Sequence, residues 1–88
     1  MQIKPGFELR RICGENIIIA HGVQNIDFSK IITLNESAAF VWNSVIGKDF
    51  TEQDMVNILV NEYEVDMMTA QNDANALVAA WKDAGLID

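Results

Sequence analysis

The sequence is poor in several features that mark whole classes of protein. It has one cysteine, Cys13, and therefore no internal disulfide, which is typical of a reducing compartment. It has one proline and half of its 88 residues are apolar, a composition found in folded chains rather than disordered ones. No apolar run approaches the roughly 20 residues that a membrane-spanning helix needs. We therefore expect a single folded domain over residues 1–88, not associated with a membrane.

Positive charge is also scarce. Six Lys and Arg residues stand against 13 Asp and Glu residues, which gives a net charge of −7. The six are spread along the chain with one adjacent pair: Lys4, Arg10, Arg11, Lys30, Lys48 and Lys82. Because phosphate neutralisation needs clustered cations, nucleic acid is not an expected partner. The N-terminal stretch lacks the apolar centre of a signal peptide, so we expect a cytoplasmic location.

Few side chains are suited to catalysis or metal binding. His21 is the only histidine, and it could approach Cys13 if the first two strands form a hairpin. Two ligands are too few for a structural zinc site, which usually has four. No glycine-rich phosphate loop and no EF-hand spacing is present. The sequence therefore predicts a protein that is not an enzyme and binds no cofactor.

The first third of the chain is rich in residues that favour strands. Alternation around Leu9 predicts a strand over about Glu8–Ile12, and three consecutive isoleucines predict another over Ile17–His21. Gly14–Asn16 is typical of a turn between them. A third strand is expected over about Phe28–Leu34, and these boundaries hold to within a few residues.

Apolar residues at helical spacing predict three helices in the remainder of the chain. The first follows the N-cap Asn35 and ends near Gly47. The second follows Thr51, with Asp54 completing a capping box. The third is expected over about Thr69–Ala84. Three strands followed by three helices indicate an α+β fold, in which the helices pack on the sheet because three strands cannot bury a face alone.

One residue of the third strand departs from its alternation. At period two, Ile32 and Leu34 share a mostly apolar face, whereas Ile31 lies on the opposite face among polar neighbours. A single exposed isoleucine is ordinary, and the register could also be one residue off. Alternatively, the strand has an open edge, and Ile31 contacts an extended peptide that pairs with it. Only Asp27 and Lys30 would blunt such an edge.

Short motifs resemble the PqqD family, which contains protein D of pyrroloquinoline quinone biosynthesis and the recognition elements of other modified-peptide pathways. The stretch LNESAAFVW at positions 34–42 matches its start of the first helix, and Gly47 and Thr51 fit its link to the second. The C-terminal pattern matches as well, through Asp73, Leu77, Trp81, Gly85, Leu86 and Ile87. Trp81 stands where leucine is common, and Ala74 is smaller than usual. The resemblance covers about Phe7 to Ile87.

The resemblance implies a winged-helix-like fold, with three N-terminal antiparallel strands followed by three helices, that does no chemistry. Members hold the leader segment of a precursor peptide as an added strand and present it to a modifying enzyme, often a radical SAM protein. Carried over by position, the peptide contacts would be Ser29, Lys30, Ile31, Ile32, Thr33, Gln71, Asn75, Val78 and Lys82. The polar residues of the third helix could equally be ordinary solvated surface.

Two further functions are compatible with these patterns. A winged-helix DNA-binding regulator has the same architecture, but its recognition helix needs Arg or Lys, and no expected helix offers more than one. A structural interaction subunit could use Met67, Met68 and Phe50, since methionine adapts to partner surfaces. An unpaired strand edge can also recruit a second copy of the chain, so a homodimer remains an open alternative.

Overall fold

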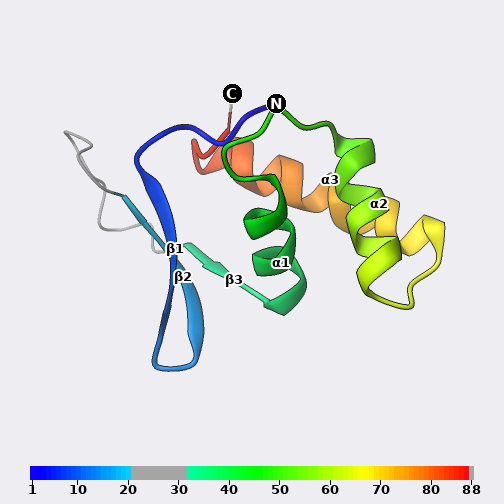
Figure 1. The fold of residues 1–88 in the computed structure, drawn as a ribbon, viewed down its shortest axis with the longest axis horizontal. Coiled ribbons are helices and arrows are strands. Elements are labelled where there is room, and N and C mark those ends of the chain that lie inside the picture. The colour runs from blue at the N-terminus through cyan, green and yellow to red at the C-terminus, as the bar shows by residue number, and fades with distance from the viewer. Residues whose placement is uncertain (21–31, 88) are drawn as a thin grey trace.

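The computed structural model describes residues 1–20 and 32–87, and in these ranges three strands precede three helices (Figure 1). The strands are β1 (Phe7–Ile12), β2 (Glu15–Ala20) and β3 (Ile32–Leu34). The helices are α1 (Glu36–Val45), α2 (Glu52–Glu62) and α3 (Met67–Asp83). Both strand pairs are antiparallel, which confirms the predicted α+β fold of three antiparallel strands followed by three helices.

β1 and β2 form a hairpin that is turned by two residues. Ile12 lies opposite Glu15, and between them Cys13 and Gly14 both have positive φ, at 52° and 79°. Turns with positive φ at both central residues suit hairpins because their twist matches that of the strands. The predicted turn is present, but it lies at Cys13 and Gly14, one residue before the predicted Gly14–Asn16, because Glu15 and Asn16 already belong to β2.

β3 pairs with β2, which gives the sheet the order β1-β2-β3 and makes β3 an edge strand. Thr33 lies opposite Ile17 and is exposed, whereas Leu34 is buried and Ile32 is half-buried. This alternation confirms the predicted faces over Ile32–Leu34. The earlier part of the predicted strand, Ile31 included, lies outside the described residues.

Side-chain caps set where the helices begin. The Asn35 side chain accepts a hydrogen bond from the Ala38 backbone N–H at 2.8 Å, and Thr51 and Asp54 form a complete capping box. Both caps were predicted and are confirmed. α3 instead begins two residues before the predicted Thr69, because the Asp66 carboxylate accepts the Thr69 backbone N–H at 2.7 Å.

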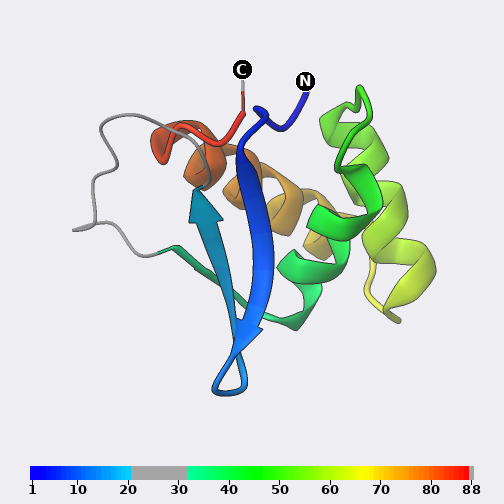
Figure 2. The same ribbon diagram turned by 60° about the vertical axis from the view of Figure 1, so that its left-hand side comes forward.

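The helices cover one face of the sheet and enclose the core (Figure 2). α1 packs on the sheet and on α2, and α2 packs on α3. Trp42 of α1 and Trp81 of α3 meet edge to face with ring centroids 5.4 Å apart, and both are fully buried. Phe50 also lies in this core, whereas Met67 and Met68 are exposed. Of the three residues of the predicted interaction surface, Phe50 is therefore not accessible to a partner, whereas Met67 and Met68 are.

The first and last described residues lie side by side (Figure 1). Ile3 bridges Ile87, and the Lys4 backbone N–H donates to the Leu86 carbonyl at 2.8 Å. The Phe50 backbone N–H donates to the Met1 carbonyl at 2.8 Å, which attaches this first segment to the α1–α2 link. Among the described helices, none combines the length and apolarity needed to cross a membrane.

Candidate functional site

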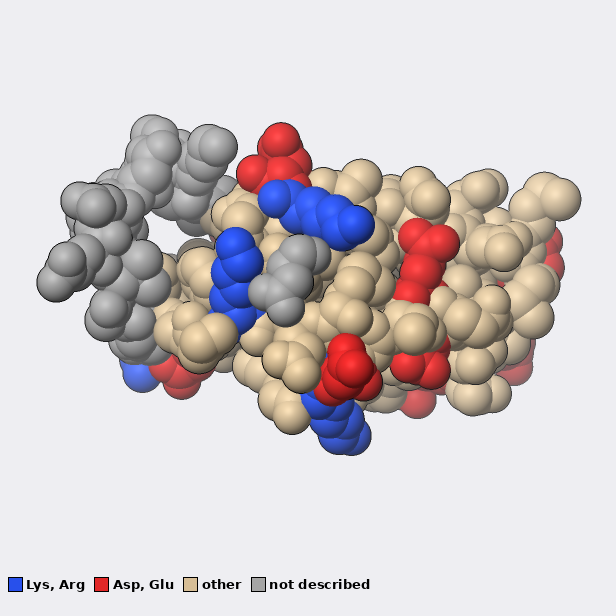
Figure 3. Space-filling view, turned by 90° about the horizontal axis from the view of Figure 1, so that it is seen from above, with Lys and Arg blue, Asp and Glu red and all other residues tan. Residues whose placement is uncertain are grey.

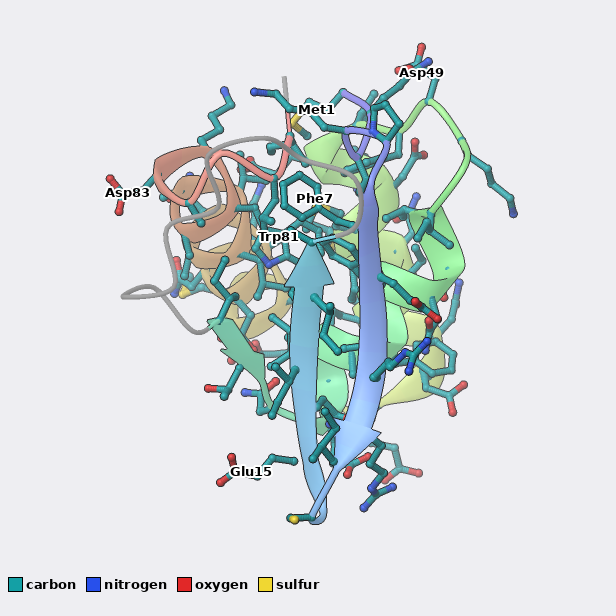
Figure 4. The ribbon with its side chains drawn as sticks, turned by 90° about the vertical axis from the view of Figure 1, so that its left-hand side faces the viewer. Met1, Phe7, Glu15, Asp49, Trp81 and Asp83 are labelled. Carbon is teal, nitrogen blue, oxygen red and sulfur yellow. The ribbon has the colours of Figure 1, made fainter. Side chains whose placement is uncertain are left out.

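The free edge of β3 is the candidate site. β2 occupies one side of this strand, and within residues 1–20 and 32–87 no other strand pairs with its second side. In Figures 2 and 4, β3 forms the outer edge of the sheet and α3 lies on that side of the molecule. An edge strand offers unpaired backbone N–H and C=O groups, which can bind an extended peptide.

Hydrogen bonds fix the end of β3 where it enters α1. The Asn16 side-chain amide donates to the Leu34 carbonyl at 3.2 Å, which links β2 to the last residue of the edge strand. Asn35 follows directly as the cap of α1, so no flexible loop separates strand from helix. At the same end, the Tyr63 hydroxyl donates to the Glu36 carbonyl at 3.4 Å. The edge is therefore held by rigid elements, as a preformed binding surface requires.

Four of the predicted site residues form one stripe along α3. Gln71, Asn75, Val78 and Lys82 are spaced by four, three and four residues, which places them on one flank of the helix. This flank adjoins the buried face that carries Ala74 and Trp81. Val78 is half-buried against the core, and the other three are exposed. The stripe is thus an amphipathic surface with a single positive charge.

The structure places only part of the predicted peptide site. Ile32 and Thr33 lie on the edge strand, and the four α3 residues lie on one helical flank. Ser29, Lys30 and Ile31 lie outside the described residues. Among the described residues, β3 packs mainly on β2 and α1, and α3 packs mainly on α2.

Asn16 is a residue that the sequence reading missed. Its side-chain amide donates to the carbonyl of Leu34, which lies 18 positions later in the sequence. A local pattern carries no signal for such a contact. Only the strand register, with Asn16 opposite Leu34, could have indicated it.

The Cys13 and His21 pair gains no support as a metal site. Cys13 lies exposed in the hairpin turn, and Ala20, the residue before His21, pairs with Phe7 at the opposite end of the hairpin. His21 itself is outside the described residues. In the described part of the chain, no three His, Cys, Asp or Glu side chains gather as they would to hold a metal ion.

Charge is strongly segregated along the chain. Residues 49–83 contain a single lysine, Lys82, and these acids: Asp49, Glu52, Asp54, Glu62, Glu64, Asp66, Asp73 and Asp83. On the face shown in Figure 3, the basic side chains lie toward the sheet, and the end formed by α2 and α3 shows acidic ones alone. This distribution opposes the binding of nucleic acid by α2 or α3.

Two solved structures have a fold similar to that of this chain. TbiB1 in complex with the TbiA(beta) leader peptide superposes with a TM-score of 0.74 at 17% identity, covering 100% of this chain and 95% of that chain. Lasso peptide synthetase B1 complexed with the leader peptide gives a TM-score of 0.70 at 21% identity, covering 97% and 93%. At these identities the likeness establishes the fold alone.

Comparison of the sequence with family models assigns the chain to a family. A comparison with curated proteins gives no match. A family model described as "Coenzyme PQQ synthesis protein D (PqqD)" matches residues 17–87. The matched region runs from β2 to the end of the described chain and includes the motifs around Asn35 and Trp81. The chain therefore belongs to the PqqD family.

Proposed function

We propose that this protein is a non-catalytic module that captures the leader segment of a ribosomally made precursor peptide and presents it to a modifying enzyme. The leader binds as an additional strand along the free edge of β3, beside the stripe on α3. The observation that carries this proposal is the sheet order β1-β2-β3, which leaves β3 paired on one side only among the described residues.

The comparisons support a peptide ligand. The two solved structures compared above are complexes with leader peptides, and the matching family model is that of a coenzyme PQQ synthesis protein. A radical SAM protein is the partner enzyme that the family resemblance implies.

The expected affinity follows from a few terms. Each backbone hydrogen bond to the edge contributes about 0.5–1.5 kcal/mol, and each buried aliphatic side chain adds roughly 1.5–3 kcal/mol. Association and ordering of the peptide cost several kcal/mol. We expect a dissociation constant of about micromolar order, a net free energy of about −8 kcal/mol, which requires contributions near the upper end of these ranges. Such binding is strong enough to deliver a peptide and weak enough to release it.

The DNA-binding alternative is disfavoured by the charges. α2 contains no Lys or Arg and α3 contains only Lys82. Base readout in the major groove needs Arg or Lys at base edges, and phosphate contacts need several more cations.

A titration tests the proposal. Isotopically labelled protein is titrated with synthetic candidate leader peptides, and backbone amide shifts are followed by NMR. We expect shifts at Ile32–Leu34 and along the α3 stripe, with β1 unchanged. Shifts confined to α2, with Ile32–Leu34 silent, would exclude binding at this edge.

The Ile31→Lys variant tests the sequence-based part of the site. It should weaken leader binding by about tenfold or more, because the burial of one isoleucine is worth roughly 1.5–3 kcal/mol. The melting temperature should hardly change. The matched control is Ile12→Lys, at an isoleucine 43% exposed on β1 at the other side of the sheet, which should leave leader binding intact. A large loss of stability in Ile31→Lys would assign Ile31 to the core instead.

A further inference from the structure

A hollow lies beside the start of β1, away from the β3 edge. It has a volume of about 410 Å³ and is lined by Gln2, Ile3, Lys4, Pro5, Phe7, Ile46, Gly47 and Lys48. The N-terminal segment forms one wall and the end of α1 forms the other. Both walls are fixed, because the Lys4 backbone N–H bonds the Leu86 carbonyl and the Ile46 backbone N–H bonds the Trp42 carbonyl at 3.0 Å.

The lining combines apolar surface with positive charge. Ile3, Pro5, Phe7 and Ile46 provide hydrocarbon, and 41% of Ile46 is exposed to solvent and therefore available for contact with a ligand. Lys4 and Lys48 provide two ammonium groups, and no acidic residue is among the lining residues. The hollow is therefore suited to a ligand with an apolar body and a negative charge.

The two lysines have no acidic partner among the described residues. Arg10 pairs with Glu8 at 3.4 Å and Arg11 pairs with Glu36 at 3.6 Å. Asp49 follows Lys48 in sequence, but its carboxylate bonds the Met1 amino group at 3.1 Å. The unpaired cations of the described chain are thus Lys4, Lys48 and Lys82, and two of these three line the hollow.

The presence of two lysines in one hollow contrasts with the negative net charge of the protein. The net charge is −7, and the acidic excess lies between residues 49 and 83. An anion is therefore repelled by most of the surface and attracted where cations are left uncompensated. A neutral or cationic ligand would gain nothing from these lysines.

We propose that this hollow is a second binding site, which takes a carboxylate carried on an apolar or aromatic body. The ligand's body rests on Ile3, Phe7 and Ile46, and its carboxylate lies between Lys4 and Lys48. The carboxylate belongs either to an acidic residue of a partner peptide or to a free organic acid, and the chemistry of recognition is the same. Because β1 and β3 are opposite edges of the sheet, this site and the leader site can be occupied together.

Titration with phenylacetate, followed by backbone amide shifts, tests the site. Phenylacetate should shift the amides of Gln2–Phe7 and Ile46–Lys48, and 0.5 M salt should weaken the binding because it screens exposed charges. Phenylacetamide, which has the same body without the charge, should bind at least several-fold more weakly. Equal binding of the acid and the amide would overturn the proposal.

Variants identify the groups that bind the carboxylate. Lys4→Gln and Lys48→Gln should each weaken phenylacetate binding by about two- to fivefold, the range expected for one exposed ion pair. Lys82→Gln is the matched control, because it removes the third unpaired lysine and lies outside the hollow. An equal loss in Lys82→Gln would mean that only the net charge matters, and unchanged binding in the Lys4 and Lys48 double variant would also contradict the site.

Two further measurements separate the ligand sources and the two sites. A capped Phe-Glu dipeptide that binds more tightly than phenylacetate assigns the site to a peptide, and the reverse order assigns it to a small acid. Leader binding, measured in parallel, should be unchanged in Lys4→Gln and Lys48→Gln and weakened in Lys82→Gln. Failure of phenylacetate to bind therefore leaves the leader site untouched, and failure of the leader to bind leaves this site untouched.

Discussion

Cys13 adopts a backbone conformation that residues with a side chain rarely adopt. Its φ is 52°, in the left-handed region, where an L-residue other than glycine or asparagine costs about 1–2 kcal/mol. The hairpin imposes this conformation because Cys13 and Gly14 are the two central residues of the turn. Gly14 follows with a φ of 79° and open space where a Cβ would lie.

Replacing Cys13 by asparagine should stabilise the hairpin. Asn-Gly is the preferred pair for a two-residue turn with two positive φ angles, so Cys13→Asn should raise the free energy of unfolding by about 0.5–1 kcal/mol. Urea denaturation measures the change. Cys13→Ser is the control, because it removes the thiol and keeps the conformational cost. An equal gain in both variants would show that the thiol, not the backbone, was responsible.

The packing of Trp42 against Trp81 could not be predicted from residue patterns. Trp42 and Trp81 are both buried, and helical spacing alone gives no sign that their rings meet edge to face. Neither indole N–H has a hydrogen-bond partner in the structure described here, so the pair is held by packing and ring contact. Large Trp81 and small Ala74 are both fully buried on α3. Which volumes fit together depends on long-range packing.

At the scale of elements, local signals predicted local structure. Asn35 and Thr51 mark their helices because a cap acts within three residues. The start of α3 was missed because Met67 and Met68, its first residues, are exposed and add nothing to the apolar stripe. The hairpin turn was missed by a residue because the sequence shows only Gly14, whereas Cys13 is forced into a similar conformation by the strand register.

The Asp66 cap gives α3 a dependence on pH. The hydrogen bonds from Thr69 hold the pKa of Asp66 below its ordinary value. A carboxyl group with a lowered folded-state pKa contributes stability above its unfolded pKa of about 3.9, and this contribution is lost as the pH falls through the folded-state pKa. Asp66→Ala should therefore lower the melting temperature at pH 7 and have little effect near pH 2.

Thermal unfolding at both pH values measures this difference. Asp73→Ala is the matched control, since Asp73 is an exposed carboxylate on the same helix for which no capping bond is present. Its effect should be small at either pH. A loss in Asp66→Ala that is equally large near pH 2 would show that the ionised carboxylate is not what stabilises the start of α3.

At the scale of the molecule, the acidic excess, the β3 edge and the hollow lie in different parts of the fold. The helices form one layer over the sheet and carry the acidic excess (Figures 1 and 3). β3, held by Asn16 and the α1 cap, presents an edge, and the hollow with Lys4 and Lys48 lies beside β1. The order of strands and helices followed from the sequence. The sheet order and the hollow did not, because each depends on segments far apart in the chain.

The central claim is that a leader peptide pairs with the backbone of β3. Along an added strand, alternate backbone N–H groups point toward β3 and the others point away. Two leader peptides N-methylated at alternating positions test this directly, with affinity measured by calorimetry. One peptide should lose about 30- to 100-fold in affinity, since two or three hydrogen bonds are removed, and the other should bind within a few-fold of the unmodified leader. Equal binding of the two N-methylated peptides would contradict pairing with β3.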